Sequence, residues 1–155
     1  MSRLDYCNSL YVNCPAEILD KLQRVQNNAA RFVLRVPRSD HISPHPRSLH
    51  WLPVEACITY KNALMSYRAT CINLSGPSYL SDLINIYTPT RSLRSTADPL
   101  TLVTPRTNRS FGEPSFSFAA PSIWNDLPLF IRSSDSDSSF RSSLRTYLFK
   151  QYFES

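Results

Sequence analysis

Cysteine and histidine are the residue types of this chain that could bind a metal ion, and all of them occur in its first half. Structural zinc sites usually combine cysteines separated by two to four residues with a second close pair of histidines or cysteines. Six residues separate Cys7 from Cys14, whereas three and four separate His41, His45 and His50. The histidine spacing suits zinc but the cysteine spacing does not, so we expect no bound metal. Because no signal peptide precedes the cysteines, we expect a reducing compartment and free thiols.

Carboxylates, nucleophiles and phosphate-binding loops offer no catalytic pattern either. Polymerases and nucleases hold metal ions with converging carboxylates, but no two acidic residues are adjacent, and Asp135 and Asp137 lie in a serine-rich linker. With two glycines in the whole chain, neither a phosphate loop nor a Gly-x-Ser-x-Gly elbow is present. We expect no catalytic centre and no cofactor. A cysteine–histidine pair that meets only in the fold is the alternative left open.

Arginine is the residue type that points most clearly to a partner. The net charge is +5, and only three of the 17 basic residues are lysines, Lys21, Lys61 and Lys150, which leaves fourteen arginines. Arginine carries a planar, always-charged group that suits phosphate and stacks on bases. The composition therefore favours RNA or DNA as a partner. An ordinary basic, solvated surface is the competing interpretation.

One strongly amphipathic helix is predicted to begin at Cys14-Pro15 and to end near Val36. Proline suits a first helical turn, and Glu17 favours its positive end. At helical spacing one face is apolar: Ile18, Leu22, Val25, Ala29, Phe32, Val33 and Val36. A different face collects Lys21, Arg24, Arg31, Arg35 and Arg38. This basic face is either a ridge that contacts phosphates or a solvated face whose charges match the helix dipole.

The other predicted helices are shorter or interrupted by proline. The periodicity predicts helices at about 2–12, 54–72 and 79–84, and a short buried turn at 116–124 broken by Pro121. A last helix at about 139–153 places Phe140, Leu144, Tyr147 and Leu148 on one face. Phe149 and Phe153 project elsewhere and are expected to lie on the surface without a partner in this chain.

Between these helices, residues 87–115 lack helical periodicity and are predicted to form an extended arm. Residues 100–103 alternate weakly, so the sequence allows one small β-hairpin near 100–112. Arginines in Ser/Thr-rich stretches, with aromatic residues nearby, suit contacts to RNA phosphates and bases. The arm supplies four such candidates: Arg91, Arg94, Arg106 and Arg109.

The predicted fold class is mainly α: an irregular helical bundle with extended Pro/Ser/Arg-rich arms. We divide the chain into a helical region 1–86, an extended arginine-rich arm 87–115 and a C-terminal helical segment 116–155. No apolar run approaches the roughly 20 residues of a membrane span, and Met1 leads into a polar stretch rather than a signal peptide. We therefore expect an intracellular protein, nuclear or cytoplasmic, with no membrane partner.

Seven phrases of the chain, in order, resemble the C-terminal region of reverse transcriptases encoded by LINE (non-LTR) retrotransposons of the Jockey-like kind. They are SRLDYCNSL (2–10), LQRVQNNAAR (22–31), LHWLPV (49–54), PSYLSDL (77–83), RSLRS (91–95), VTPR (103–106) and AAPSIWNDLP (119–128). The resemblance covers the chain to about Phe149.

In that family the endonuclease and the polymerase palm, with its paired aspartates, lie upstream of this region. The resemblance implies that residues 1–86 are thumb-like, that the rest is a C-terminal extension, and that the chain is a fragment of a larger RNA-directed DNA polymerase. It implies nucleic-acid binding, with the missing palm as a further partner, and catalysis by no residue present here. The alternatives are a helical protein-interaction module and an inert retrotransposon relic without function.

Overall fold

Helices form almost all of the regular structure, so the mainly α prediction is confirmed. The computed structural model describes residues 8–37, 39–40, 47–70, 78–88, 100–105 and 115–154. Within these ranges lie the 3-10 turn η1 (Asn8–Tyr11) and six α-helices. The helices are α2 (Ala16–Leu34), α4 (Val54–Thr70), α5 (Ser78–Ser81), α6 (Phe116–Asp126), α7 (Leu129–Arg132) and α8 (Asp137–Phe153).

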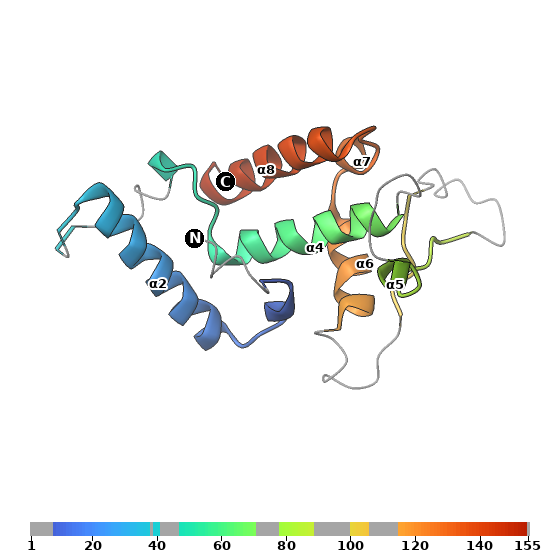
Figure 1. Ribbon diagram of the computed structural model, residues 1–155, viewed down its shortest axis with the longest axis horizontal. Coiled ribbons are helices and arrows are strands. Elements are labelled where there is room, and N and C mark those ends of the chain that lie inside the picture. Colours follow the sequence, from blue (N-terminus) through green and yellow to red (C-terminus); the bar gives the residue numbers. More distant parts are fainter. Residues whose placement is uncertain are drawn as a thin grey trace.

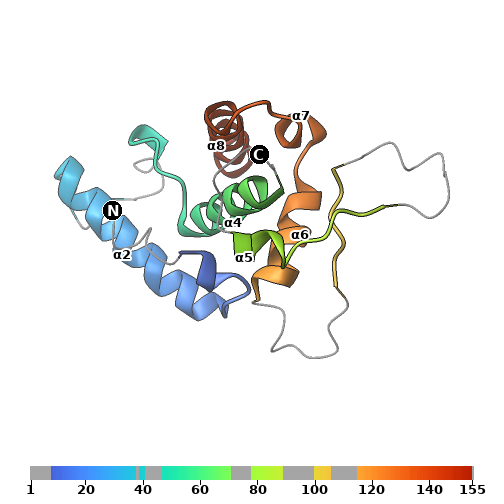
Figure 2. The same ribbon diagram turned by 45° about the vertical axis from the view of Figure 1, so that its right-hand side comes forward.

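Helix α4 is the central element of the molecule. It packs against α6, α8, α5, α2 and η1 (Figures 1 and 2). Helix α8 runs along one side of α4, α6 crosses it, and α2 lies at one end of the molecule, away from α8. Because apolar side chains are spread around α4 rather than confined to one stripe, the helix can be covered from several directions.

Three aromatic side chains from three helices form the middle of the core. The rings of Tyr67 on α4 and Phe140 on α8 stack with their centroids 4.1 Å apart, and Trp124 on α6 lies 6.0 Å from Phe140 and 6.4 Å from Tyr67. The hydroxyl of Tyr67 donates a hydrogen bond to the carbonyl of Ser134 at 2.7 Å. The cluster therefore joins α4, α6 and α8 and satisfies its own polar group.

The described part of the predicted arm is tied to α6 by side-chain hydrogen bonds. The indole Nε1 of Trp124 donates to the carbonyl of Leu100 at 2.6 Å. The amide of Asn125 accepts from the backbone N–H of Leu102 and donates to its carbonyl, both at 2.9 Å. Leu102, only 2% exposed, thereby enters the core. Residues 100–105 thus form a strap across α6.

The described residues do not show the predicted hairpin near 100–112. Leu102 forms an isolated antiparallel bridge with Ile86, which precedes the arm, rather than with a strand that follows it. The hydrogen bonds from Tyr87 N to Thr101 O and from Val103 N to Asn85 O, each 2.8 Å, hold this bridge. Residues 106–114, the second half of the predicted hairpin, lie outside the described ranges.

Two predicted features of the C-terminal region are wrong. Helix α6 continues through Pro121 and is not broken there. The proline costs the helix one backbone hydrogen-bond donor, but its fully buried ring packs in the core and offsets that loss. Phe149 has partners: its ring stacks on His50 at 5.6 Å, tilts against Phe153 at 4.7 Å and packs on the core cluster. The predicted face of α8 is correct, because Phe140, Leu144 and Leu148 are buried.

Candidate nucleic-acid interface

The basic ridge comprises Lys21, Arg24 and Arg31 on α2 and Arg35 at its C-cap. Two glutamines fix the position of this helix. Gln26 is 3% exposed, and its Nε2 donates to the carbonyl of Leu52 at 2.8 Å. The Oε1 of Gln23 accepts from the backbone N–H of Val54 at 2.9 Å, which satisfies a free donor at the start of α4. This role of the glutamines is not predicted by the sequence analysis, although two glutamines three residues apart necessarily share a helix face.

The C-terminal end of α2 uses Arg31 to shape the following loop. The helix ends at Leu34, and Arg35 adopts the left-handed conformation with φ 54°, where a glycine is usual. The guanidinium of Arg31 donates to the carbonyls of Pro37 at 2.6 Å and Asp40 at 2.8 Å. Arg31, one of the predicted contacts, therefore lies at the ridge but also holds this loop against the helix end.

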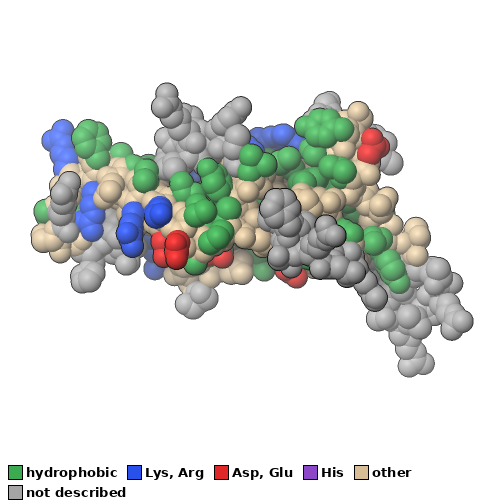
Figure 3. Space-filling view, turned by 90° about the horizontal axis from the view of Figure 1, so that it is seen from below, with side chains coloured by type: hydrophobic (Ala, Val, Ile, Leu, Met, Phe, Trp, Pro, Cys, Tyr) green, Lys and Arg blue, Asp and Glu red, His purple; other side chains and the backbone are tan. Residues whose placement is uncertain are grey.

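Three basic side chains remain available at this end of the molecule: Lys21 and Arg24 on α2, and Arg35 at its C-cap. All three are exposed, and no described acidic residue pairs with any of them. At helical spacing Lys21 is about 60° from Arg24 around the axis, and Arg35 directly follows the last helical residue. Figure 3 shows basic side chains gathered at the end of the molecule that α2 forms, with exposed hydrophobic side chains beside them.

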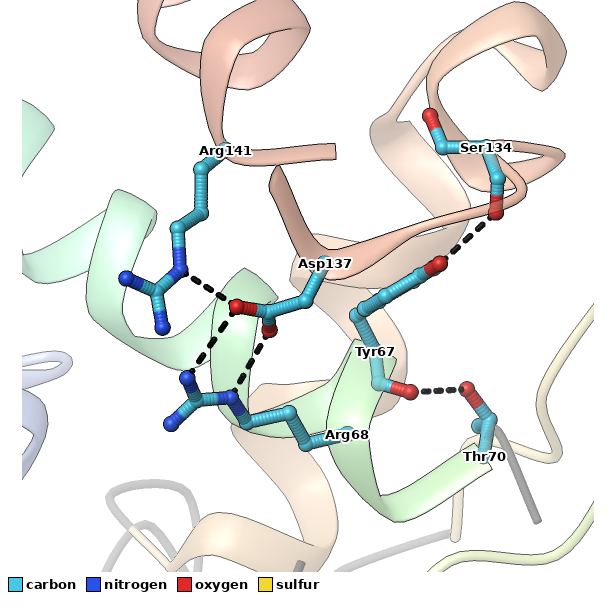
Figure 4. A network of polar contacts seen from close by, with 6 residues as sticks. All are labelled: Tyr67, Arg68, Thr70, Ser134, Asp137 and Arg141. Atoms are coloured by element: carbon cyan, nitrogen blue, oxygen red, sulfur yellow. Dashed lines mark hydrogen bonds and ion pairs between the residues drawn. The ribbon is translucent and has the colours of Figure 1, made fainter. Parts of the chain in front are cut away.

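The arginines of the helical core bind other groups of the chain and are not available to a ligand. Asp137, in the first turn of α8, binds Arg68 (Nε to Oδ1, 2.9 Å) and Arg141 (Nε to Oδ2, 2.7 Å), as Figure 4 shows. The buried Arg132 donates to the carbonyl of Leu127 at 2.9 Å. These groups support the fold; of the exposed basic residues whose side chains have no described ion pair or hydrogen bond, Lys21, Arg24 and Arg35 lie on α2 or at its C-cap, and Arg47 and Lys150 lie elsewhere.

Replacing Asp137 with asparagine is expected to cost about 0.5–1 kcal/mol of stability at neutral pH, because its pair remains partly exposed to solvent. The hydrogen bond from Arg68, and then the charges of Arg68 and Arg141, hold the pKa of Asp137 below its ordinary value. The pair therefore stabilises the fold above the unfolded-state pKa of about 4 and loses this effect as the pH falls through the folded-state pKa. Urea denaturation at several pH values measures the difference, and a gap that stays constant in acid would contradict this account.

Several predicted residues cannot be located. Arg38, Arg91, Arg94, Arg106 and Arg109 lie outside the described ranges, so their relation to the ridge on α2 is not defined. Three of the residues considered as zinc ligands, Cys7, His41 and His45, also lie outside the described ranges. Within the part of the chain that is described, no three His, Cys, Asp or Glu side chains form a group that could hold a metal ion. None of the described helices is long and apolar enough to cross a bilayer.

No family model, curated protein or solved structure matches this chain. The resemblance to LINE reverse transcriptases therefore stays a prediction from the sequence phrases. The interface is defined by geometry alone: an exposed helix at one end of the molecule, two available cations on it and a third at its C-cap, and a guanidinium that holds the loop at its end.

Proposed function

We propose that this chain is a non-catalytic nucleic-acid-binding region equivalent to the thumb side and C-terminal extension of a LINE-type reverse transcriptase. The observation that carries the proposal is the row of available cations on α2 and at its C-cap, Lys21, Arg24 and Arg35, beside a core whose other arginines are engaged in the fold. The seven sequence phrases that resemble the family supply the polymerase context.

The arrangement suits contacts to a phosphate backbone rather than recognition of base edges. Lys21 and Arg35 are 14 residues apart, so the row extends over about 21 Å of helix. Phosphate contacts of this kind set affinity and orientation without reading sequence. In this proposal the chain holds RNA or DNA, and the polymerase chemistry belongs to a palm that supplies its own aspartates.

Single-stranded RNA is expected to bind the purified chain weakly, and the affinity should fall steeply as salt rises. The double substitution Arg24→Gln/Arg35→Gln should lower the affinity at low salt and reduce the slope of log affinity against log salt by about 1.4, since each single-strand phosphate contact contributes about 0.7. Fluorescence anisotropy of a labelled RNA oligonucleotide across a salt series measures both quantities.

A matched control removes two positive charges at positions outside α2. Arg47 and Lys150 are exposed and lie outside α2, so Arg47→Gln/Lys150→Gln should leave the slope nearly unchanged. Equal losses in the two double variants would show that net charge alone drives binding and would reject the ridge on α2. Undetectable binding of the unmodified chain at low salt would reject the nucleic-acid role altogether.

A further inference from the structure

Helix α2 docks on the rest of the chain through its glutamine side and leaves much of its apolar face uncovered. Gln23 and Gln26 attach it to the start of α4. On the neighbouring side Val25 is 53% exposed, Phe32 87% and Val33 55%. An amphipathic helix normally covers such a stripe with its own core. Here the attachment consists of the two glutamines together with Leu19 and Leu22, so that Val25 and Phe32 remain exposed.

The apolar residues of α2 have the spacing of a helix that packs against another helix. Steps of four and three residues alternate along the apolar seam, which we define as Ile18, Leu22, Val25, Ala29 and Phe32. This alternation is the a/d pattern of a coiled coil, in which each side chain inserts between residues of a facing helix. Ile18, Val25 and Phe32, the exposed members, recur every seven residues. The seam is about 21 Å long, enough for a partner helix of several turns.

The two edges of the apolar seam differ in what they already contact. Along one edge, Leu19 and the neighbouring seam residue Leu22 pack on the cluster formed by Val12, Val54, Ile58 and Ala119, and Gln26 binds Leu52. The other edge, with Lys21, Asn28 and Arg35 at seven-residue spacing, is exposed. A partner helix can therefore match charges only with the basic edge, and edge charges set partner choice in helix pairs.

A second copy of this chain fits the seam poorly. In an antiparallel pair of α2 helices the two free edges would face each other, so that Lys21 of one copy would approach Arg35 of the other. In a parallel pair each free edge would face the edge that Gln26 already occupies. Like charges at facing positions oppose association. Charge complementarity instead favours a partner with carboxylates at these positions.

We propose that the apolar seam of α2 binds an amphipathic helix of another protein whose apolar stripe is bordered by aspartate and glutamate. The partner's apolar side chains pack around Val25 and Phe32, and its carboxylates pair with Lys21 and Arg35. This docking surface goes beyond the proposed nucleic-acid binding, because Val25 and Phe32 contribute nothing to phosphate contacts.

The test uses two synthetic helical peptides with the full chain. Both carry leucine and isoleucine at heptad a and d positions; one has glutamate and the other lysine at the edge positions. The acidic peptide, fluorescently labelled, should bind in anisotropy titrations, and the basic one should bind at least about tenfold more weakly. Val25→Ser/Phe32→Ser should lower the affinity for the acidic peptide by at least about tenfold. Because both side chains are exposed, the thermal melt of this variant should match that of the unmodified chain.

Two control variants separate the seam from general hydrophobic and charge effects. Phe130→Ser removes another exposed phenylalanine, 66% exposed on α7, and should retain the acidic peptide. Lys21→Glu/Arg35→Glu should reverse the preference toward the basic peptide. Equal binding of the two peptides to the unmodified chain, or unchanged binding of the acidic peptide by the serine variant, would overturn the proposal.

Two further measurements address the other possible occupants. RNA affinity of Val25→Ser/Phe32→Ser should stay within about twofold of the unmodified chain; a parallel loss of RNA and peptide would assign the seam to the nucleic-acid interface and overturn the proposal. Light scattering should show a monomer. A dimer abolished by the serine variant would make a second copy the occupant, which also overturns it. Since the serine variant should weaken peptide binding and leave RNA affinity nearly unchanged, whereas undetectable RNA binding by the unmodified chain would reject only the nucleic-acid role, failure of either proposal is visible separately.

Discussion

Replacing Phe140 with alanine is expected to lower the free energy of unfolding by about 3–5 kcal/mol, the usual cost of emptying a buried phenylalanine site. Phe140 is fully buried, its ring stacks on that of Tyr67, and the ring of Trp124 lies near both. Since a domain of this size is stable by only about 5–15 kcal/mol, the variant should unfold at far lower urea concentration or lack a cooperative transition. Urea denaturation followed by circular dichroism measures the change.

Phe130 provides the matched control for that substitution. It is also a phenylalanine in the C-terminal region, but its side chain is 66% exposed, so Phe130→Ala should change stability by less than about 0.5 kcal/mol. Similar unfolding curves for the two variants would contradict the core described here. A chain that shows no cooperative transition even without substitution would support the alternative of an inert relic that never folds stably.

Replacing Asn125 with alanine is expected to cost about 2 kcal/mol, because two hydrogen bonds to Leu102 are lost and the backbone groups they served remain shielded from water. The substitution should also loosen the structure locally around Leu102. The amide of Leu102 should exchange with solvent at least about tenfold faster, since the strap loses its attachment to α6. Hydrogen exchange measured by mass spectrometry over residues 100–105 tests this.

Asn28→Ala is the comparison for the asparagine variant. Asn28 is exposed on α2, so its loss should leave both stability and exchange at Leu102 nearly unchanged. If Leu102 remained protected in the Asn125 variant, the bridge to Ile86 rather than the asparagine would be what holds the strap.

The positions of the helices followed from local sequence patterns. The predicted start of α2 at Pro15 is within one residue of the observed Ala16, because proline at a helix start acts through its own backbone. The buried face of α8 followed from helical spacing for the same local reason. Helix α7 was not predicted, because four residues are too few to show a periodicity.

Which face of a helix packs inward depends on distant partners, and there the sequence was insufficient. The amphipathic pattern of α2 is among the clearest in the chain, yet its buried side is the one with Gln26 and Ala30. The choice depends on Leu52 and Val54, which provide the backbone partners for the glutamines. Phe149 is a similar case, because its partner His50 lies in a separate segment far back in the chain.

The candidate site could be predicted in part. Arginine spacing alone placed Arg24, Arg31 and Arg35 on one side of a helix, and two of them are available to a ligand. The role of Arg31 depends on the carbonyls of Pro37 and Asp40, whose direction is set by the loop conformation and not by residue type. The arginines of the arm stay predictions, because they lie outside the described ranges.

The central place of α4 has a consequence for how the chain folds as it leaves the ribosome. Tyr67 and the Ser134 carbonyl that it binds are 67 positions apart, and Phe140 is synthesised later still. At a synthesis rate of about 5–20 residues per second, roughly 3–13 seconds pass between the synthesis of Tyr67 and that of Ser134. During that time the apolar surface of α4 is exposed to chaperones and to other nascent chains. The core is therefore expected to form only after the segment with Phe140 has left the ribosome.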